Sequence, residues 1–185
     1  MPTFRTSRPV LAADLALPNI ILVGLPGAGK SSVGRAVAEA LGMNFLDFDA
    51  EIERREHMSV TQIFAERGER RFRELERGLT DELKTAGNFV VSPGGGWIAN
   101  PGCLEALRPP ATVIYLQVEP ERALKRMSTQ ASARPLLNRP NPLAELEKLL
   151  ADRKDLYLLA DHTVRVDFLR EKEVIAVIVA LASKK

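Results

Sequence analysis

Several features are scarce in this sequence, and each scarcity argues against a class of protein. The single cysteine, Cys103, excludes a disulfide within the chain and is typical of a reducing compartment, so we expect a cytoplasmic location. No apolar run approaches the roughly 20 residues that a membrane-spanning helix needs, and we expect no contact with a membrane. The two histidines, His57 and His162, have no spacing typical of a metal site or a catalytic triad.

The net charge is also small. The chain has 26 Lys and Arg against 24 Asp and Glu, and its formal charge of +2 is too low to indicate a nucleic-acid partner. Small anions are the more natural ligands, because several arginines can still gather around one of them. At 185 residues the chain has the length of one large domain, and we expect a monomer.

The first 18 residues differ from the rest. They contain three prolines and no sustained periodicity, and their first 13 positions hold two arginines and no acid. This composition fits a flexible arm over 1–18 or the remnant of an organelle-targeting peptide, and the lack of a clear amphipathic arginine pattern favours the arm. We therefore expect a single domain over 19–185.

Short β-rich apolar runs alternate with segments of helical periodicity along that domain. The runs predict five strands, at 19–23, 44–48, 88–92, 111–118 and 162–167. Apolar residues at three- and four-residue spacing predict helices at 31–42, 49–56, 59–87, 100–108, 119–127 and 141–161. The alternation predicts an α/β fold with three layers, in which helices cover both faces of a five-stranded parallel sheet. Ligands of such sheets bind outside the carboxyl ends of the strands.

The stretch "GLPGAGKSS" follows the first predicted strand and opens the first predicted helix. It matches G-x-x-x-x-G-K-[ST], the phosphate-binding loop of nucleoside triphosphate enzymes. Glycines allow consecutive backbone N–H groups to point into one concavity at the start of a helix. In this pattern Lys30 reaches the β- and γ-phosphates and Ser31 binds Mg²⁺. The predicted ATP-binding residues here are Gly27, Ala28, Gly29, Lys30, Ser31 and Ser32.

Two aspartates, Asp47 and Asp49, stand at the end of the second predicted strand. Alternate residues of a strand share a face, so both carboxylates point into the cleft if the strand continues that far. Alternatively, Asp49 is the N-cap of the helix that follows. The pair alone does not decide between the two arrangements.

Two other groups lie close to predicted strand ends or on a charged helix. Arg70, Arg71 and Arg73 belong to a helical segment rich in Glu, where most arginines pair with acids in solvent. The third strand runs into three consecutive glycines at 94–96. They indicate a close approach of the backbone to a ligand, with a simple tight turn as the alternative.

Taken in order, these motifs resemble those of the shikimate kinase family. The resemblance rests on the D-x-D pair, "FR" at Phe72 and Arg73, the triple glycine, "RPLL" at 134–137 and an arginine shortly before "LY". It implies a phosphate-loop kinase of the nucleoside monophosphate kinase type. It also implies ATP as co-substrate, Mg²⁺ as cofactor, and transfer of a phosphoryl group to the 3-hydroxyl of shikimate in aromatic amino-acid biosynthesis.

The resemblance assigns roles residue by residue on the acceptor side. Asp49 contacts shikimate, while Arg73 and Arg153 bind the shikimate carboxylate, a task that suits the planar guanidinium. A hydroxyl that attacks a γ-phosphate also needs a carboxylate that takes its proton, and Asp49 fits that role. The substrate-binding residues are then Asp49, Arg73, Gly94, Gly95, Gly96 and Arg153.

The resemblance also assigns residues on the nucleotide side. Arg126 matches an arginine that stacks on adenine, and Arg134 lies on a lid at about 128–142 that closes over ATP. Because Mg²⁺ keeps several waters and takes few direct protein ligands, we also expect Asp47 to hold it through water, beside Ser31. The catalytic set is Lys30, Asp49 and Arg134.

Three departures from the family pattern leave alternatives open. Phe48 separates the two aspartates, Trp97 replaces a small residue after the triple glycine, and the expected R-x-P-L-Y reads "RKDLY" from Arg153. Trp97 either packs under the sheet edge or reshapes the acceptor site. The alternative functions are a kinase of another small hydroxy acid such as gluconate, and a non-catalytic sensor that kept the nucleotide fold.

Overall fold

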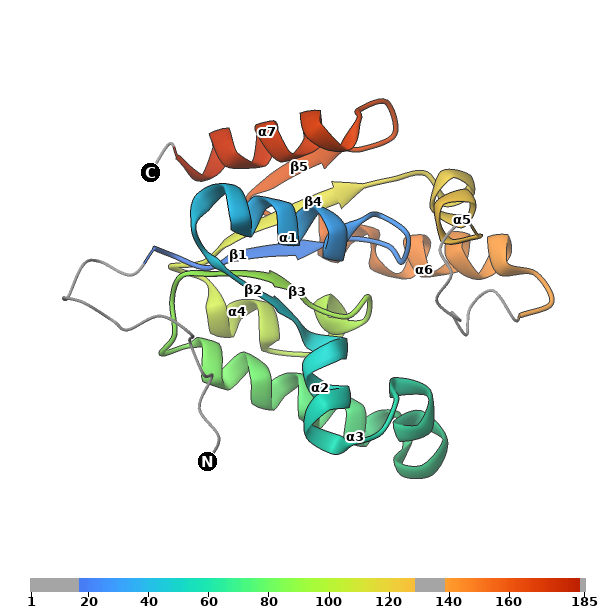
Figure 1. The fold of residues 1–185 in the computed structure, drawn as a ribbon. Helices are drawn as coiled ribbons and strands as arrows, with labels where there is room; N and C mark the ends of the chain where they lie inside the picture. Colours follow the sequence, from blue (N-terminus) through green and yellow to red (C-terminus); the bar gives the residue numbers. More distant parts are fainter. Residues whose placement is uncertain (1–16, 129–138, 184–185) are drawn as a thin grey trace.

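The computed structural model describes residues 17–128 and 139–183, which fold around a parallel sheet (Figure 1). Within these ranges the sheet has five strands in the order β2-β3-β1-β4-β5. Their bounds are Ile20–Val23 (β1), Asn44–Asp47 (β2), Phe89–Ser92 (β3), Thr112–Gln117 (β4) and His162–Arg165 (β5). All four strand pairings are parallel, so the predicted fold class is confirmed.

The helices that the structure describes connect these strands or follow the last one. Their bounds are Lys30–Leu41 (α1), Phe48–Glu56 (α2), Val60–Leu83 (α3), Cys103–Leu107 (α4), Pro120–Ser128 (α5), Pro142–Tyr157 (α6) and Glu171–Ala182 (α7), with a 3₁₀ helix at Trp97–Ala99 (η1). Right-handed crossovers in this strand order place α1 on one face of the sheet and α3, α4 and α6 on the other. The last helix, α7, packs beside α1 (Figure 1).

The strands bury their side chains according to their place in the sheet. Every residue of β1 and β3 is buried, because helices cover both faces of these inner strands. The edge strands β2 and β5 are only partly buried. None of the helices in the described ranges combines the length and the apolar content needed to cross a bilayer.

Three elements differ from the sequence-based expectation. The second strand ends at Asp47, and Phe48 already belongs to α2. The long helix α3 is interrupted at Gly68, whose φ of 79° and ψ of 166° are not helical. The helix α7 was not predicted; its start is marked by Glu173, whose carboxylate accepts a 2.7 Å hydrogen bond from the backbone N–H of Arg170.

Two predicted features fall mainly outside the described residues. The predicted arm at 1–18 contributes only Leu17 and Pro18 to the described part, and most of the predicted lid at 128–142, with Arg134, lies outside it.

Candidate active site

The phosphate-binding loop joins β1 to α1 at the carboxyl edge of the sheet (Figure 1). Gly27 and Gly29 have φ of 83° and 93°, a region that favours glycine. A Cβ on Gly27 would stand 2.5 Å from the carbonyl oxygen of Ala123, so a larger residue would displace α5 from the loop. Gly29 is the N-cap of α1 and supplies no side-chain cap, a helix start at which backbone N–H groups can bind an anion.

Lys30 lies folded against this loop. Its Nζ donates hydrogen bonds to the carbonyl oxygens of Gly24, at 2.9 Å, and Leu25, at 3.0 Å. The ammonium group is therefore already held over the loop, where the motif requires a positive charge for phosphate oxygens.

Ser31, Asp47 and Ser92 bring three oxygen-bearing side chains together beside the loop. The Ser31 hydroxyl donates to Asp47 Oδ2 at 2.6 Å, and its Oγ lies 3.3 Å from Ser92 Oγ. Asp47 and Ser92 are register partners across β2 and β3. The described residues contain no cluster of three or more His, Cys, Asp or Glu side chains that could hold a metal. The set nevertheless fits Mg²⁺, which binds oxygen ligands and keeps several of its waters.

A hollow of about 300 Å³ opens on the other side of the loop. Its lining includes Gly27, Ser32 and Arg126 together with Val166 and Leu169. Arg126 Nη2 donates to the carbonyl oxygen of Val166 at 2.6 Å, so its guanidinium is fixed at this hollow. The structure therefore places Arg126 next to the phosphate loop, where the resemblance assigns it to the nucleotide base.

The two aspartates do not alternate along a strand, and the N-cap hypothesis for Asp49 is wrong. Asp47 is the N-cap of α2, and its Oδ1 accepts a 3.3 Å hydrogen bond from the backbone N–H of Ala50. Asp49 lies in the first turn of α2. The strand ends earlier than expected because the carboxylate of Asp47 starts a helix at the next residue.

Asp49 still points into the cleft. A Cβ on Gly94 would lie 2.7 Å from Asp49 Oδ1, and this buried oxygen has no hydrogen-bond partner among the described residues. The pKa of Asp49 is raised to about 6, chiefly by burial and also by the nearby Asp47, while Lys30 opposes the shift. Asp49 is therefore a buried carboxylate whose Oδ1 can accept a hydrogen bond from a ligand.

The three arginines of α3 have different surroundings. Arg70 is exposed and pairs with Glu74, and Arg71 makes long ion pairs of 3.6 Å, as is common for surface arginines. Arg73 pairs with Glu69 and also lies against the triple glycine, where a Cβ on Gly96 would overlap its guanidinium. The absence of a side chain at Gly96 therefore lets Arg73 lie flat against the loop backbone.

A buried acid that sequence reasoning missed accompanies Arg73. Glu76 is fully buried, and its Oε2 accepts a 2.7 Å hydrogen bond from Arg73 Nη1. Burial raises the pKa of Glu76, while the Arg73 guanidinium beside it lowers it. In the sequence, Glu76 is marked only by its position three residues after Arg73, on the helix face that buries Phe72 and Leu79. This position does not distinguish it clearly from the other glutamates of the same helix.

The predicted acceptor residues meet at the triple glycine. It follows β3, and its three residues contact side chains from three different helices. Gly94 lies against Asp49 of α2, Gly96 lies against Arg73 of α3, and the carbonyl oxygen of Gly95 accepts a 2.7 Å hydrogen bond from Arg153 Nη1 of α6. The structure thus brings together every predicted acceptor residue from Asp49 to Arg153.

Trp97 packs rather than lining the cleft. Its side chain is fully buried, and its Nε1 donates a 2.9 Å hydrogen bond to Thr80 Oγ1. The packing interpretation of this departure from the family pattern is confirmed. Of the predicted site residues, Arg134 alone lies outside the described residues.

The comparisons with known proteins agree with this geometry. The family model described as "Shikimate kinase" matches residues 26–182. A shikimate kinase of Mycobacterium avium is 43% identical over 150 residues, which are 81% of this chain and 84% of that protein. A solved shikimate kinase from Acinetobacter baumannii in complex with shikimate has a TM-score of 0.82 and 38% identity, and covers 91% of this chain and 95% of its own.

A gluconokinase from Sinorhizobium meliloti has a TM-score of 0.60 at 20% identity, with coverage of 91% of this chain and 93% of its own, and this likeness shows the fold alone. The matched family model, the identity with curated relatives and the arrangement of the cleft give one conclusion: this chain belongs to the shikimate kinase family.

Proposed function

We propose that this protein transfers the γ-phosphoryl group of ATP to the 3-hydroxyl of shikimate, giving ADP and shikimate 3-phosphate for aromatic amino-acid biosynthesis. The observation that carries this proposal is the meeting of Arg73 and Arg153 at the triple glycine, beside the buried Asp49. Two guanidinium groups from different helices suit a carboxylate on a small rigid ring, and a carboxylate next to them suits its hydroxyls.

On the donor side, the phosphates of ATP lie along the backbone N–H groups from Gly27 to Ser32. The ammonium of Lys30 moves from its two loop carbonyls to the β- and γ-phosphates, which attract it more strongly because they are charged. Arg126 holds the nucleotide base at the hollow between α1 and α7. Arg134, from the predicted lid, adds positive charge over the phosphates.

Ser31 and Asp47 would hold the magnesium ion, Asp47 through water, and Ser92 would contribute to the same site. When bound, the ion would supply positive charge that neutralises charge on the β- and γ-phosphates. The Ser31 hydroxyl donates its proton to Asp47 Oδ2 and still has oxygen lone pairs, so this hydrogen bond is compatible with the proposed role of Ser31.

On the acceptor side, Arg73 and Arg153 fix the carboxylate of shikimate and thereby the orientation of its ring. The oxygen of the 3-hydroxyl attacks the γ-phosphorus, the bond to the β–γ bridging oxygen breaks, and the hydroxyl proton passes to Asp49. With a pKa of about 6, Asp49 is ionised at neutral pH and is a stronger base than an ordinary aspartate.

We also propose that the protein acts in the cytoplasm and as a monomer. The single cysteine supports a reducing compartment. Asp49, Arg73 and Arg153 meet at the triple glycine within one copy of the chain, which supports a monomer as the active unit.

The test is an assay of ADP release with ATP, Mg²⁺ and a panel of hydroxy acids. We expect turnover with shikimate and only background release with gluconate or with no acid. Faster turnover with gluconate would show that gluconate, rather than shikimate, is the acceptor of the same phosphoryl transfer. Nucleotide binding without turnover on any acid would favour the non-catalytic sensor.

A further inference from the structure

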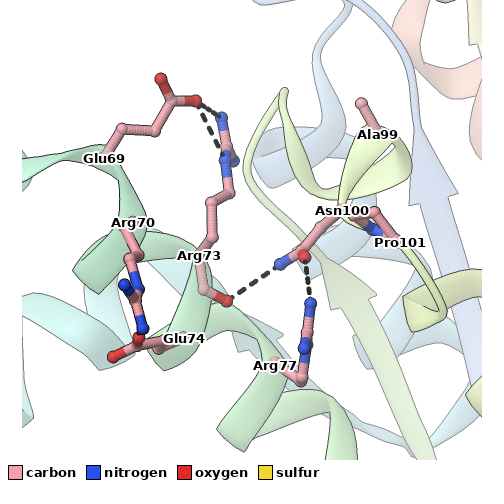
Figure 2. A pocket seen from close by; sticks show the side chains of 8 residues that line it. All are labelled: Glu69, Arg70, Arg73, Glu74, Arg77, Ala99, Asn100 and Pro101. Carbon is pink, nitrogen blue, oxygen red and sulfur yellow. Dashed lines mark hydrogen bonds and ion pairs between the residues drawn. The ribbon is translucent and has the colours of Figure 1, made fainter.

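The segment after the triple glycine is bound to α3 by buried hydrogen bonds that the proposed reaction does not use. It comprises η1 and Asn100, and its contacts with α3 involve the side chains of Trp97, Thr80 and Asn100. We call this set of contacts the α3–η1 seam. It adjoins a surface hollow of about 520 Å³, whose lining residues Figure 2 shows.

Asn100 makes one half of the seam. Its side chain is 4% exposed, and both ends of its amide are occupied. Nδ2 donates to the carbonyl oxygen of Arg73 at 2.9 Å, while Oδ1 accepts a 3.1 Å hydrogen bond from Arg77 Nη2 (Figure 2). Asn100 therefore grips the helical turn that carries Arg73.

Trp97 and Thr80 make the other half. Trp97 Nε1 donates to Thr80 Oγ1 at 2.9 Å, and Thr80 Oγ1 donates to the carbonyl oxygen of Glu76 at 2.8 Å. The hydroxyl is thus acceptor and donor at once, and both side chains are at most 1% exposed. This chain of hydrogen bonds ends on the turn that carries Glu76, the buried partner of Arg73.

The segment is tied to the triple glycine as well. The backbone N–H of Trp97 donates to the carbonyl oxygen of Gly94 at 3.0 Å, and the N–H of Ala99 donates to that of Gly96 at 3.0 Å. The seam therefore links the glycine backbone to the helix whose Arg73 lies against it.

We propose that Asn100, Thr80 and Trp97 are positioning residues that set the distance between the triple glycine and the Arg73 guanidinium, and thereby the affinity for the acceptor's carboxylate. This inference rests on the proposed function. None of the three residues touches a reacting atom. They act through Arg73. Its guanidinium lies so close to Gly96 that no side chain fits between the two residues, so a small shift of α3 changes where Arg73 can bind a carboxylate.

Asn100→Ala tests the first half of the seam. It removes both amide contacts, and we expect the KM for shikimate to rise on the order of tenfold, since a lost buried hydrogen bond has about this effect on an equilibrium. The KM for ATP and kcat should change less than about twofold. Steady-state kinetics with each substrate varied in turn measures this separation.

Asn19→Ala is the matched control. Asn19 is also a buried asparagine with both amide ends used, donating to the carbonyl oxygen of Ala86 at 2.7 Å and accepting from the backbone N–H of Phe89 at 3.0 Å. It lies at the amino end of the sheet, before β1, away from the cleft. We expect a lower Tm for this variant with an unchanged KM for shikimate.

Thr80→Val and Thr80→Ser test the second half with little change in volume. Valine leaves Trp97 Nε1 without its acceptor, and we expect a rise in the KM for shikimate, while serine keeps the hydroxyl and should restore it. If Asn100→Ala does not fold, this pair decides alone.

The proposal is wrong if Asn100→Ala or Thr80→Val leaves the KM for shikimate unchanged in a folded protein. It is also wrong if both substrates' KM values rise together, or if Asn19→Ala raises the KM for shikimate equally. A wild-type protein that does not phosphorylate shikimate would instead contradict the proposed function, so the two failures are distinguishable.

Discussion

The two halves of the cleft are built in different ways. The donor half consists mainly of nine consecutive residues, Gly24 to Ser32, which run from the end of β1 into the first turn of α1. The acceptor half combines side chains of α2, α3 and α6 with the triple glycine, from positions 49 to 153. Local backbone conformation therefore shapes the first half, whereas packing between distant helices shapes the second.

The difference appears in how each half is held. Gly27 and Gly29 give the phosphate loop its shape through positive φ angles, which depend on the residue type itself. Arg73 is held by Glu69 and Glu76, by its contact with Gly96 and by the α3–η1 seam. Substitutions on the acceptor side should therefore affect the acceptor alone, and those on the donor side the phosphates.

The strongest test of this division is Asp49→Asn, at the junction of the two halves. The amide keeps the shape but cannot accept the proton, so we expect kcat to fall by about a thousandfold. Titration with ATP should show nucleotide affinity near that of the wild type. Loss of ATP affinity as the main effect would instead place Asp49 on the metal.

Lys30→Ala should have the next largest effect and be confined to the donor half. Removing the ammonium takes away charge at the phosphates, and we expect kcat to fall by about a hundredfold or more. Binding of shikimate alone, measured by calorimetry, should change much less, because Arg73 and Arg153, the proposed ligands of its carboxylate, come from other helices, α3 and α6. Activity above a few per cent of wild type would contradict the assignment of the phosphate loop.

Gly96→Ala should have the smallest effect and be confined to the acceptor half. The added Cβ meets the Arg73 guanidinium, which must move, and we expect the KM for shikimate to rise by about tenfold with the KM for ATP unchanged. Gly78→Ala is the control, since a Cβ at this position of α3 meets nothing within 4 Å. An unchanged KM for shikimate in Gly96→Ala would show that Arg73 does not need this contact.

The same division explains what the sequence could predict. The phosphate loop and the five strands follow from local pattern, and the structure confirms both. The arrangement of Asp47 and Asp49 could not be predicted in this way, because one capping hydrogen bond decides where the strand ends and the helix starts.

Two features were missed for reasons that are also physical. The helix α7 is rich in β-branched residues, which favour strands in isolation, and its packing against α1 overrides that preference. In the sequence, Glu76 cannot be distinguished from the exposed glutamates of α3, because only the tertiary fold buries it beside Arg73. The resemblance to a family supplied the acceptor residues, since no local pattern joins Asp49 to Arg153.

The most direct test of the two-part cleft is a crystal structure of this protein with ADP, Mg²⁺ and shikimate. We predict that the carboxylate of shikimate lies between Arg73 and Arg153, with a ring hydroxyl in hydrogen-bond contact with Asp49 and the β-phosphate of ADP in the loop at Gly27 to Ser32. Shikimate bound away from these two arginines, or with its carboxylate directed at the phosphate loop, would contradict the account.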